Sequence, residues 1–140
     1  KEIQKKKGQT PITCLTSYAN AFTKILDKYC DIILVGDSVG MVLYGMSTTR
    51  NVKIDTMILH AKAVKSASKR SLVVVDMPYK TYSNKLEAYK NAKKIIKMTK
   101  CDGVKLEGGK NIVNIIRYLI KKKNTSNGTC RAASSIFKKF

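Results

Sequence analysis

Three short apolar runs, each followed by a carboxylate, constrain the fold of this chain more than any other feature of its sequence. The runs DIILVG, LVVV and GVKL lead directly to Asp37, Asp76 and Glu107. A short apolar run bounded by turn residues is typical of a strand buried on both faces of a parallel sheet. Ligands of such sheets bind beyond the carboxyl ends of the strands. We therefore expect the three carboxylates to meet at one rim.

Amphipathic helical patterns separate the apolar runs, so strands and helices alternate along the chain. We expect strands over residues 11–18, 31–36, 72–76 and 104–107. We expect helices over residues 19–29, 55–67, 84–98 and 111–122, a charged arm over 1–9 and a long connection over 42–53. Asn84 is predicted to cap the third helix. The apolar residues predicted to face the core from the first helix are Phe22, Ile25, Leu26 and Tyr29.

This alternation places the chain in the α/β class. Strand and helix units joined by short turns predict parallel strands with right-handed crossovers. Four such units fit a doubly wound open sheet or the N-terminal half of a (β/α)8 barrel. The glycine fingerprint of nucleotide-binding open sheets is missing, because Gly36 and Gly40 do not form Gly-x-Gly-x-x-Gly. Carboxylates at three successive strand ends favour the half barrel, since barrel active sites lie at that rim.

The carboxylates at this rim suggest metal chemistry. Two Asp and one Glu offer hard oxygen ligands, which suit Mg²⁺ with positions left for water and substrate. Lys105 and Glu107 are two residues apart, so a shared strand face would place an ammonium beside the metal. Such a site can hold an oxoacid and stabilise an enolate, which suggests proton abstraction next to a carbonyl followed by carbon–carbon bond formation. Taken singly, each carboxylate could instead belong to a turn; their repetition at equivalent strand ends favours a functional site.

The chain has a net charge of +19, and a large positive charge is common in nucleic-acid-binding proteins. Only four of the 28 basic residues are Arg, however, and the lysines are spread over most of the predicted helices. No nucleic-acid-reading motif accompanies them. The pattern therefore favours solvated helix faces and no specific nucleic-acid partner. His60 lies beside the apolar stripe of its predicted helix, so we expect a structural or surface role for it and not a catalytic one.

The cysteines and the hydropathy indicate where in the cell the protein is expected. Cys14, Cys30, Cys101 and Cys130 lack the paired short spacing of zinc sites and are expected to be reduced thiols. No apolar stretch approaches the roughly 18 residues that span a bilayer. A cytoplasmic protein without a membrane partner is expected.

Five segments carry a resemblance to a known enzyme family. They read ITCLTSY (residues 12–18), LVGDSVGM (34–41), HAKAV (60–64), DMPY (76–79) and VKLEGG (104–109). Their order and spacing across residues 5–122 resemble those of ketopantoate hydroxymethyltransferase, also called 3-methyl-2-oxobutanoate hydroxymethyltransferase, the first committed enzyme of pantothenate biosynthesis. The chain departs from the family pattern at Met46, Arg50 and Asn51.

The resemblance implies a (β/α)8 barrel in which Asp37, Asp76 and Glu107 hold Mg²⁺. It implies that Asp37, Ser38, Asp76 and Lys105 bind 3-methyl-2-oxobutanoate. Family members transfer a hydroxymethyl group from the co-substrate 5,10-methylenetetrahydrofolate to the Mg-bound enolate of that ketoacid, giving 2-dehydropantoate. The full-length family enzyme is expected to be a homo-oligomer. The family's general-base Glu has no counterpart among these 140 residues, so no catalytic base is assigned and the chain alone is expected to be inactive.

Residues 124–140 abandon the family pattern where a fifth strand would begin. We therefore divide the chain into a partial barrel domain, residues 1–123, and a tail, residues 124–140. A shifted reading of the possible codons of the tail permits Ile-Pro-Val-Met-Gly-His-Val-Gly and then Pro-Gln-Ser, which resembles the family's fifth strand and following loop. Our hypothesis is a one-base insertion near the lysine run 121–123. The coding DNA tests it, because codons that cannot yield this shifted reading would exclude a frameshift.

Two other functions remain open from the sequence. One is another Mg-dependent barrel enzyme acting on oxoacids, similar to the phosphoenolpyruvate mutase and isocitrate lyase group. The other is a non-enzymatic basic fragment that binds polyanions. Substrate screening would separate the first from the transferase, and a salt-dependent nucleic-acid titration would reveal the second.

Overall fold

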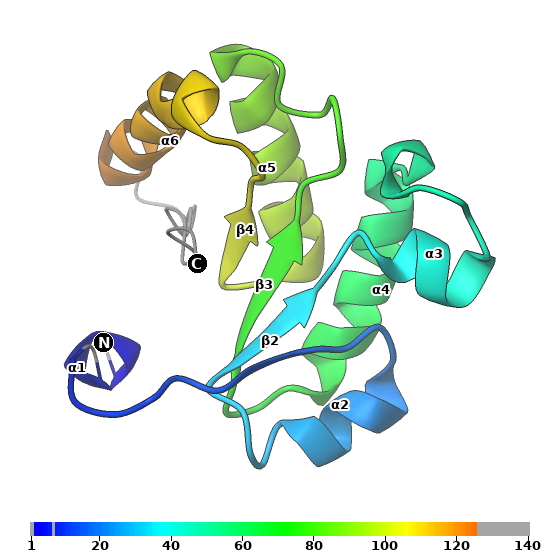
Figure 1. Cartoon of the computed structure of the whole chain (residues 1–140). Helices are drawn as coiled ribbons and strands as arrows, with labels where there is room; N and C mark the ends of the chain where they lie inside the picture. Colours follow the sequence, from blue (N-terminus) through cyan, green and yellow to red (C-terminus); the bar gives the residue numbers. More distant parts are fainter. Residues whose placement is uncertain (1, 7, 126–140) are drawn as a thin grey trace.

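Four parallel strands form one sheet in the order β1-β2-β3-β4. The computed structural model describes residues 2–6 and 8–125, and its strands are β1 (Cys14–Thr16), β2 (Ile32–Val35), β3 (Leu72–Asp76) and β4 (Gly103–Lys105). In Figure 1 the arrows of β2, β3 and β4 point the same way, as parallel pairing requires. Four predicted strands and their parallel order are thus confirmed.

Helices lie between consecutive strands, before the first strand and after the last. They are α1 (Glu2–Lys6), α2 (Asn20–Leu26), α3 (Val39–Tyr44), α4 (Ile54–Ala67), α5 (Lys85–Thr99) and α6 (Val113–Thr125), with two 3-10 turns, η1 (Thr49–Asn51) and η2 (Lys110–Ile112). α4 packs against α2 and α5, and α5 packs against α6. Figure 1 shows α4 and α5 together behind the strands. Within the described part of the chain, no helix combines the length and apolarity needed to cross a bilayer.

The core lies between the sheet and these helices. Successive side chains of a strand point to opposite faces, so Ile33, Val35, Val73 and Val75 share one face, and all four are fully buried. Buried residues of the helices pack against them: Met57, Ala61, Val64, Ala88, Ala92 and Ile95. The other face carries Val74 and then, at its end, Asp76. The same alternation that builds the core therefore directs this carboxylate away from it.

The inner stripe predicted for the first helix is wrong. Phe22, Ile25 and Tyr29 are 67%, 61% and 71% exposed, whereas Leu26 packs against the core. The buried residue of α2 is Thr23, whose hydroxyl donates to the carbonyl of Ala19 at 2.8 Å. Helix α2 ends at Leu26 and packs along one side, against α4, so the apolar residues on its other side have no described neighbour.

The long connection predicted over residues 42–53 contains helical structure instead. Helix α3 begins at Val39 and ends at Tyr44, and Gly45 follows it in the left-handed conformation with φ of 62°. Glycine adopts this conformation without a steric cost, so it ends the helix here. The helix escaped prediction because it is only six residues long and exposes four apolar side chains in a row, from Met41 to Tyr44, so it has no amphipathic pattern.

The fourth strand is shorter than predicted. β4 ends at Lys105, so Glu107 lies beyond the strand and not on its face. Gly108, with φ of 150°, turns the chain after it. The predicted last helix corresponds to η2 and α6. The expected boundary after residue 123 falls within α6, and residues 126–140 of the predicted tail lie outside the described residues, as does Cys130; Cys14, Cys30 and Cys101 are free thiols.

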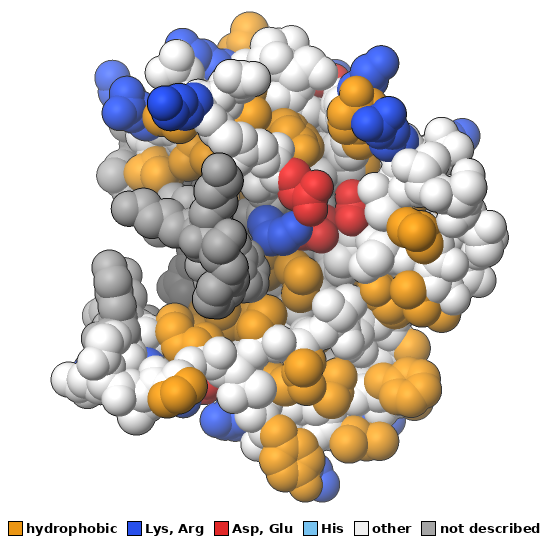
Figure 2. All heavy atoms as spheres, viewed as in Figure 1, with side chains coloured by type: hydrophobic (Ala, Val, Ile, Leu, Met, Phe, Trp, Pro, Cys, Tyr) orange, Lys and Arg blue, Asp and Glu red, His pale blue; other side chains and the backbone are white. Residues whose placement is uncertain are grey.

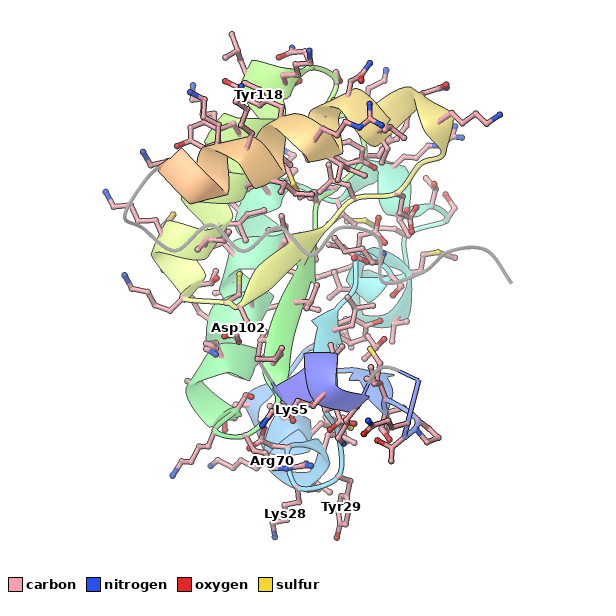
Figure 3. The ribbon with its side chains drawn as sticks, turned by 90° about the vertical axis from the view of Figure 1, so that its left-hand side faces the viewer. Lys5, Lys28, Tyr29, Arg70, Asp102 and Tyr118 are labelled. Carbon is pink, nitrogen blue, oxygen red and sulfur yellow. The ribbon has the colours of Figure 1, made fainter. Side chains whose placement is uncertain are left out.

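A polar cluster around Asp27 holds together the turns at the amino ends of β2 and β3. Asp27, 8% exposed, follows α2 and accepts hydrogen bonds from the backbone amides of Lys69, Arg70 and Ser71, which precede β3. The Arg70 guanidinium donates to the carbonyls of Lys28 and Cys30 at 3.1 and 3.0 Å. Figure 3 shows Arg70 and Lys28 together at this end. These bonds tie the turn before β2 to the turn before β3.

Candidate metal centre

The structure brings the three predicted carboxylates together. Asp37 follows β2, Asp76 ends β3 and Glu107 follows β4, and one carboxylate oxygen of each lies within 4.8 Å of the others. Asp76 is buried, Asp37 is half-buried and Glu107 is exposed. Figure 2 shows acidic side chains gathered beside a basic one near the middle of this face.

Strand register places the ammonium of Lys105 in this cluster. Asp76 and Lys105 are paired residues of the adjacent strands β3 and β4, so their side chains project from the same face of the sheet. Lys105 Nζ lies 2.7 Å from Asp76 Oδ1 and 3.5 Å from Glu107 Oε1. The predicted proximity of Lys105 and Glu107 holds, although Glu107 reaches the amine from the turn after the strand.

Burial and charge shift the pKa values of these groups in a consistent way. Burial raises the pKa of Asp37, and the nearby charge of Glu107 raises it further. Burial also raises the pKa of Asp76, against the opposing effect of Lys105. Burial alone would lower the pKa of Lys105, but the hydrogen bond and charge of Asp76 raise it. Lys105 therefore stays cationic at neutral pH, and the two aspartates are costly to keep ionised without more positive charge.

These residues fit a divalent cation. Three carboxylates face a single ammonium, so the cluster carries excess negative charge within a few ångströms. Asp76 Oδ1 is buried and, among the described residues, no hydrogen bond satisfies it beyond its ion pair with Lys105. A cation of charge +2 would offset both the repulsion and the burial of the carboxylates, and hard oxygen donors suit Mg²⁺.

The hydroxyl of Ser38 lies at the edge of the cluster. Ser38 immediately precedes α3, and its Oγ lies 2.7 Å from the hydroxyl oxygen of Tyr18, the residue two positions after β1. The backbone amide of Asp37 donates to Asp76 Oδ2 at 3.3 Å. A Cβ atom at Gly36 would lie 2.9 Å from Ser38 Oγ, so the chain needs glycine here to leave room for the serine.

A pocket of about 620 Å³ opens beside the carboxylates. The residues that line it include Asp37, Glu107, Arg50, Tyr79 and Tyr82. The Arg50 guanidinium carbon lies 5.2 Å from the centre of the Tyr79 ring, and the Tyr82 hydroxyl donates to the carbonyl of Glu107 at 3.1 Å. Tyr79 lies in the DMPY segment, which begins with Asp76, and this closeness to a predicted site residue is the sequence signal that could have placed it at the pocket.

Comparisons with known proteins agree on one family. A family profile described as ketopantoate hydroxymethyltransferase matches residues 1–125. A 3-methyl-2-oxobutanoate hydroxymethyltransferase of Pelagibacter ubique is 55% identical over 119 residues, which cover 85% of this chain and 46% of the relative. Enzymes of the same name from Anaplasma marginale and Brucella canis are 50% and 45% identical, over 86% and 87% of this chain and 44% and 45% of theirs. The chain thus spans less than half the length of these relatives.

A solved structure supports the barrel architecture. The crystal structure of 2,3-dimethylmalate lyase, a member of the phosphoenolpyruvate mutase/isocitrate lyase superfamily, matches with a TM-score of 0.63 over 81% of this chain and 43% of that chain. Its sequence identity is 14%, so the match concerns the fold alone. The predicted half of a (β/α)8 barrel is confirmed.

Proposed function

The chain belongs to the ketopantoate hydroxymethyltransferase family, and from this premise we propose that it carries the metal and ketoacid site of a transferase. The proposed reaction moves a hydroxymethyl group from 5,10-methylenetetrahydrofolate to 3-methyl-2-oxobutanoate, giving 2-dehydropantoate. The observation that carries the proposal is the meeting of Asp37, Asp76 and Glu107 around the ammonium of Lys105.

Asp37, Asp76 and Glu107 would hold a Mg²⁺ ion. When bound, the ion would polarise the ketone and stabilise the negative charge that develops on its oxygen. The two buried or half-buried aspartates come from the ends of adjacent strands, so the sheet holds them at a fixed separation before any ligand arrives. Glu107 follows β4, and its side chain is exposed. The exposed side of the cluster would leave positions on the ion open for a substrate.

Lys105 and Ser38 would bind the carboxylate of the ketoacid. The Lys105 ammonium is held in place by Asp76 and is cationic at neutral pH, as a carboxylate ligand requires. The Ser38 hydroxyl can donate a hydrogen bond to a second carboxylate oxygen. Both groups lie beside the carboxylate cluster, so they would orient the carbon next to the ketone toward the pocket.

The pocket offers room for a second substrate. Its volume of about 620 Å³ exceeds what a five-carbon ketoacid needs. The face of Tyr79, with Arg50 stacked on it, provides an aromatic and cationic surface at the pocket's rim. A flat, anionic co-substrate such as a folate suits that surface. This supports the assignment of 5,10-methylenetetrahydrofolate as the donor of the one-carbon unit.

Calorimetric titration of the chain tests the proposal. We expect 3-methyl-2-oxobutanoate to bind at least about tenfold more tightly with saturating Mg²⁺ than with EDTA, because both ligands share the site. Asp76→Asn removes a buried metal ligand and is expected to abolish this metal dependence. Asp55→Asn, on the exposed first turn of α4, should leave it unchanged. The proposal would be contradicted if the affinity for the ketoacid were the same with Mg²⁺ and with EDTA and were unchanged by Asp76→Asn.

A further inference from the structure

The single histidine of the chain connects α4 to the end of α3 and to the segment after β1. His60 lies on α4 and is half-buried. Its Nδ1 lies 2.7 Å from the backbone carbonyl of Tyr18, and its Nε2 lies 2.8 Å from the hydroxyl of Tyr44 at the end of α3. The hydroxyl of Tyr18 in turn contacts Ser38 Oγ at 2.7 Å. A continuous chain of contacts therefore runs from α4 to Ser38.

The donors and acceptors in this chain of contacts can be assigned from chemistry. A carbonyl oxygen only accepts, so His60 Nδ1 must carry a proton and donate to Tyr18. In a neutral imidazole Nε2 is then bare, and it accepts from the Tyr44 hydroxyl. Both tyrosine rings also meet the imidazole edge to face, with centroids 6.5 Å (Tyr18) and 5.8 Å (Tyr44) away. His60 is thus held on both sides and fixes the backbone of Tyr18.

Either hydroxyl of the Tyr18–Ser38 pair can donate, so the Tyr18 hydroxyl can set which way the Ser38 proton points. If Ser38 donates to a substrate carboxylate, its oxygen is free to accept from Tyr18. A Tyr18 hydroxyl that donates at 2.7 Å would leave the Ser38 proton directed away from Tyr18. Without Tyr18, the serine hydroxyl would rotate freely and lose order before the substrate binds.

We propose that Tyr18 and His60 are positioning residues for the ketoacid: His60 fixes the backbone of Tyr18, and the Tyr18 hydroxyl orients the proton of Ser38 toward the substrate carboxylate. The inference rests on the proposed function, because it takes Ser38 as a ligand of the ketoacid. It assigns to the HAKAV segment a role that the metal centre leaves unexplained.

Titration of 3-methyl-2-oxobutanoate at saturating Mg²⁺ tests the inference. Tyr18→Phe removes only the hydroxyl and should weaken ketoacid binding about five- to tenfold. His60→Ala should weaken it to a similar degree, and the double variant should be no weaker than either single variant, because both act through one hydroxyl. His60→Asn keeps a donor near the Nδ1 position and should restore most of the affinity. The exposed Tyr29→Phe is the matched control.

Two further measurements separate positioning from general damage to the fold. The affinity for Mg²⁺ alone should change less than about twofold in Tyr18→Phe, since the hydroxyl touches no carboxylate of the cluster. Because the chain has one histidine, its ¹⁵N NMR spectrum reports a single imidazole. We expect the proton on Nδ1, and a proton on Nε2 alone would overturn the inference.

The controls also distinguish the two proposals. If the wild-type chain fails to bind ketoacid with Mg²⁺, the proposed function and this inference both fail. If the wild-type chain binds ketoacid but Tyr18→Phe binds it equally well, the inference alone fails. If the losses of ketoacid affinity from Tyr18→Phe and His60→Ala add in the double variant, the inference fails. It also fails if the variants lose affinity for Mg²⁺ and for the ketoacid equally, because Tyr18 and His60 would then only stabilise the fold.

Discussion

Two buried aspartates show how the surroundings of one residue type determine its role. Asp27 accepts hydrogen bonds from three backbone amides and from the Ser68 hydroxyl, so its charge is well satisfied. Asp76, 4% exposed, has one cationic partner, Lys105, on Oδ1, and one backbone amide, that of Asp37, donates to its Oδ2. The pKa of Asp27 is lowered and that of Asp76 is raised. Asp27 stabilises the fold at one end of the strands, whereas Asp76 stores unfavourable charge at the end where a cation would bind.

Asp27→Asn should destabilise the chain by about 2 to 3 kcal/mol, because the amide cannot accept from all of these donors. Burial by itself would raise the pKa of Asp27, but the backbone hydrogen bonds from Ser71, Lys69 and Arg70 lower it below its ordinary value. A lowered pKa stabilises the folded state at pH values above the unfolded pKa of about 3.9, and that contribution is lost as the pH falls through the folded value.

Urea unfolding at several pH values checks this prediction. The difference in free energy of unfolding between wild type and Asp27→Asn should be constant from neutral pH to about pH 5 and should shrink below about pH 4. Asp55→Asn, at an exposed ion pair, should change the free energy of unfolding by less than about 0.5 kcal/mol. A difference that grows on acidification would contradict the assignment of Asp27.

The helices and strands differ in how well the sequence predicted them. Strands β2 and β3 and helices α4 and α5 matched because period and length agree with burial, and Asn84 caps α5 as predicted by accepting from the Glu87 amide at 2.9 Å. Helix α3 was missed because its apolar residues are exposed, and the inner face of α2 was misassigned because Phe22 and Ile25 have no described partner. Periodicity predicts which residues can be buried, not which neighbour is present to bury them.

The carboxylate cluster was predictable for a different reason. Parallel strands bring their carboxyl ends to one edge whatever the details of packing, so three residues that follow three strands must converge. The contributions proposed for Tyr18 and Arg50 were not predictable, since both residues lie between strands and longer helices, and the one proposed for His60 depends on its contacts with Tyr18 and Tyr44. Hydrophobic periodicity predicts helices and strands, and it does not predict contacts of this kind.

Lys100 ends α5 in the left-handed conformation, with φ of 60°, where a side chain is strained. Lys100→Gly should therefore raise the free energy of unfolding by about 0.5 to 1 kcal/mol, after allowance for the greater freedom of glycine in the unfolded chain. Lys90→Gly, at an exposed position inside the same helix, should lower it by about 1 kcal/mol. Urea unfolding of the two variants checks the pair. Equal destabilisation by both would show that Lys100 is not strained.

The described part of the chain forms one side of a barrel, with strands β1 and β4 at its two edges. Apolar side chains are exposed on β1 and around α2: Leu15 is 46% exposed, α2 presents Phe22 and Ile25, and Tyr29 follows the helix. The relatives are more than twice as long as the matched segment. The metal ligands and the ketoacid ligands proposed here all lie within that segment, so it should supply a working half of the site to a complete barrel.

A chimaeric enzyme tests this most directly. Residues 1–123 of this chain would replace the matched segment of the Pelagibacter ubique relative, which is 55% identical, and formation of 2-dehydropantoate would be measured with Mg²⁺ and 5,10-methylenetetrahydrofolate. We expect the chimaera to be active, Asp76→Asn within it to lose roughly 100-fold or more of that activity, and the unfused chain to show no turnover. A folded chimaera whose activity survives Asp76→Asn, or turnover by the unfused chain at the rate of the chimaera, would contradict the assignment.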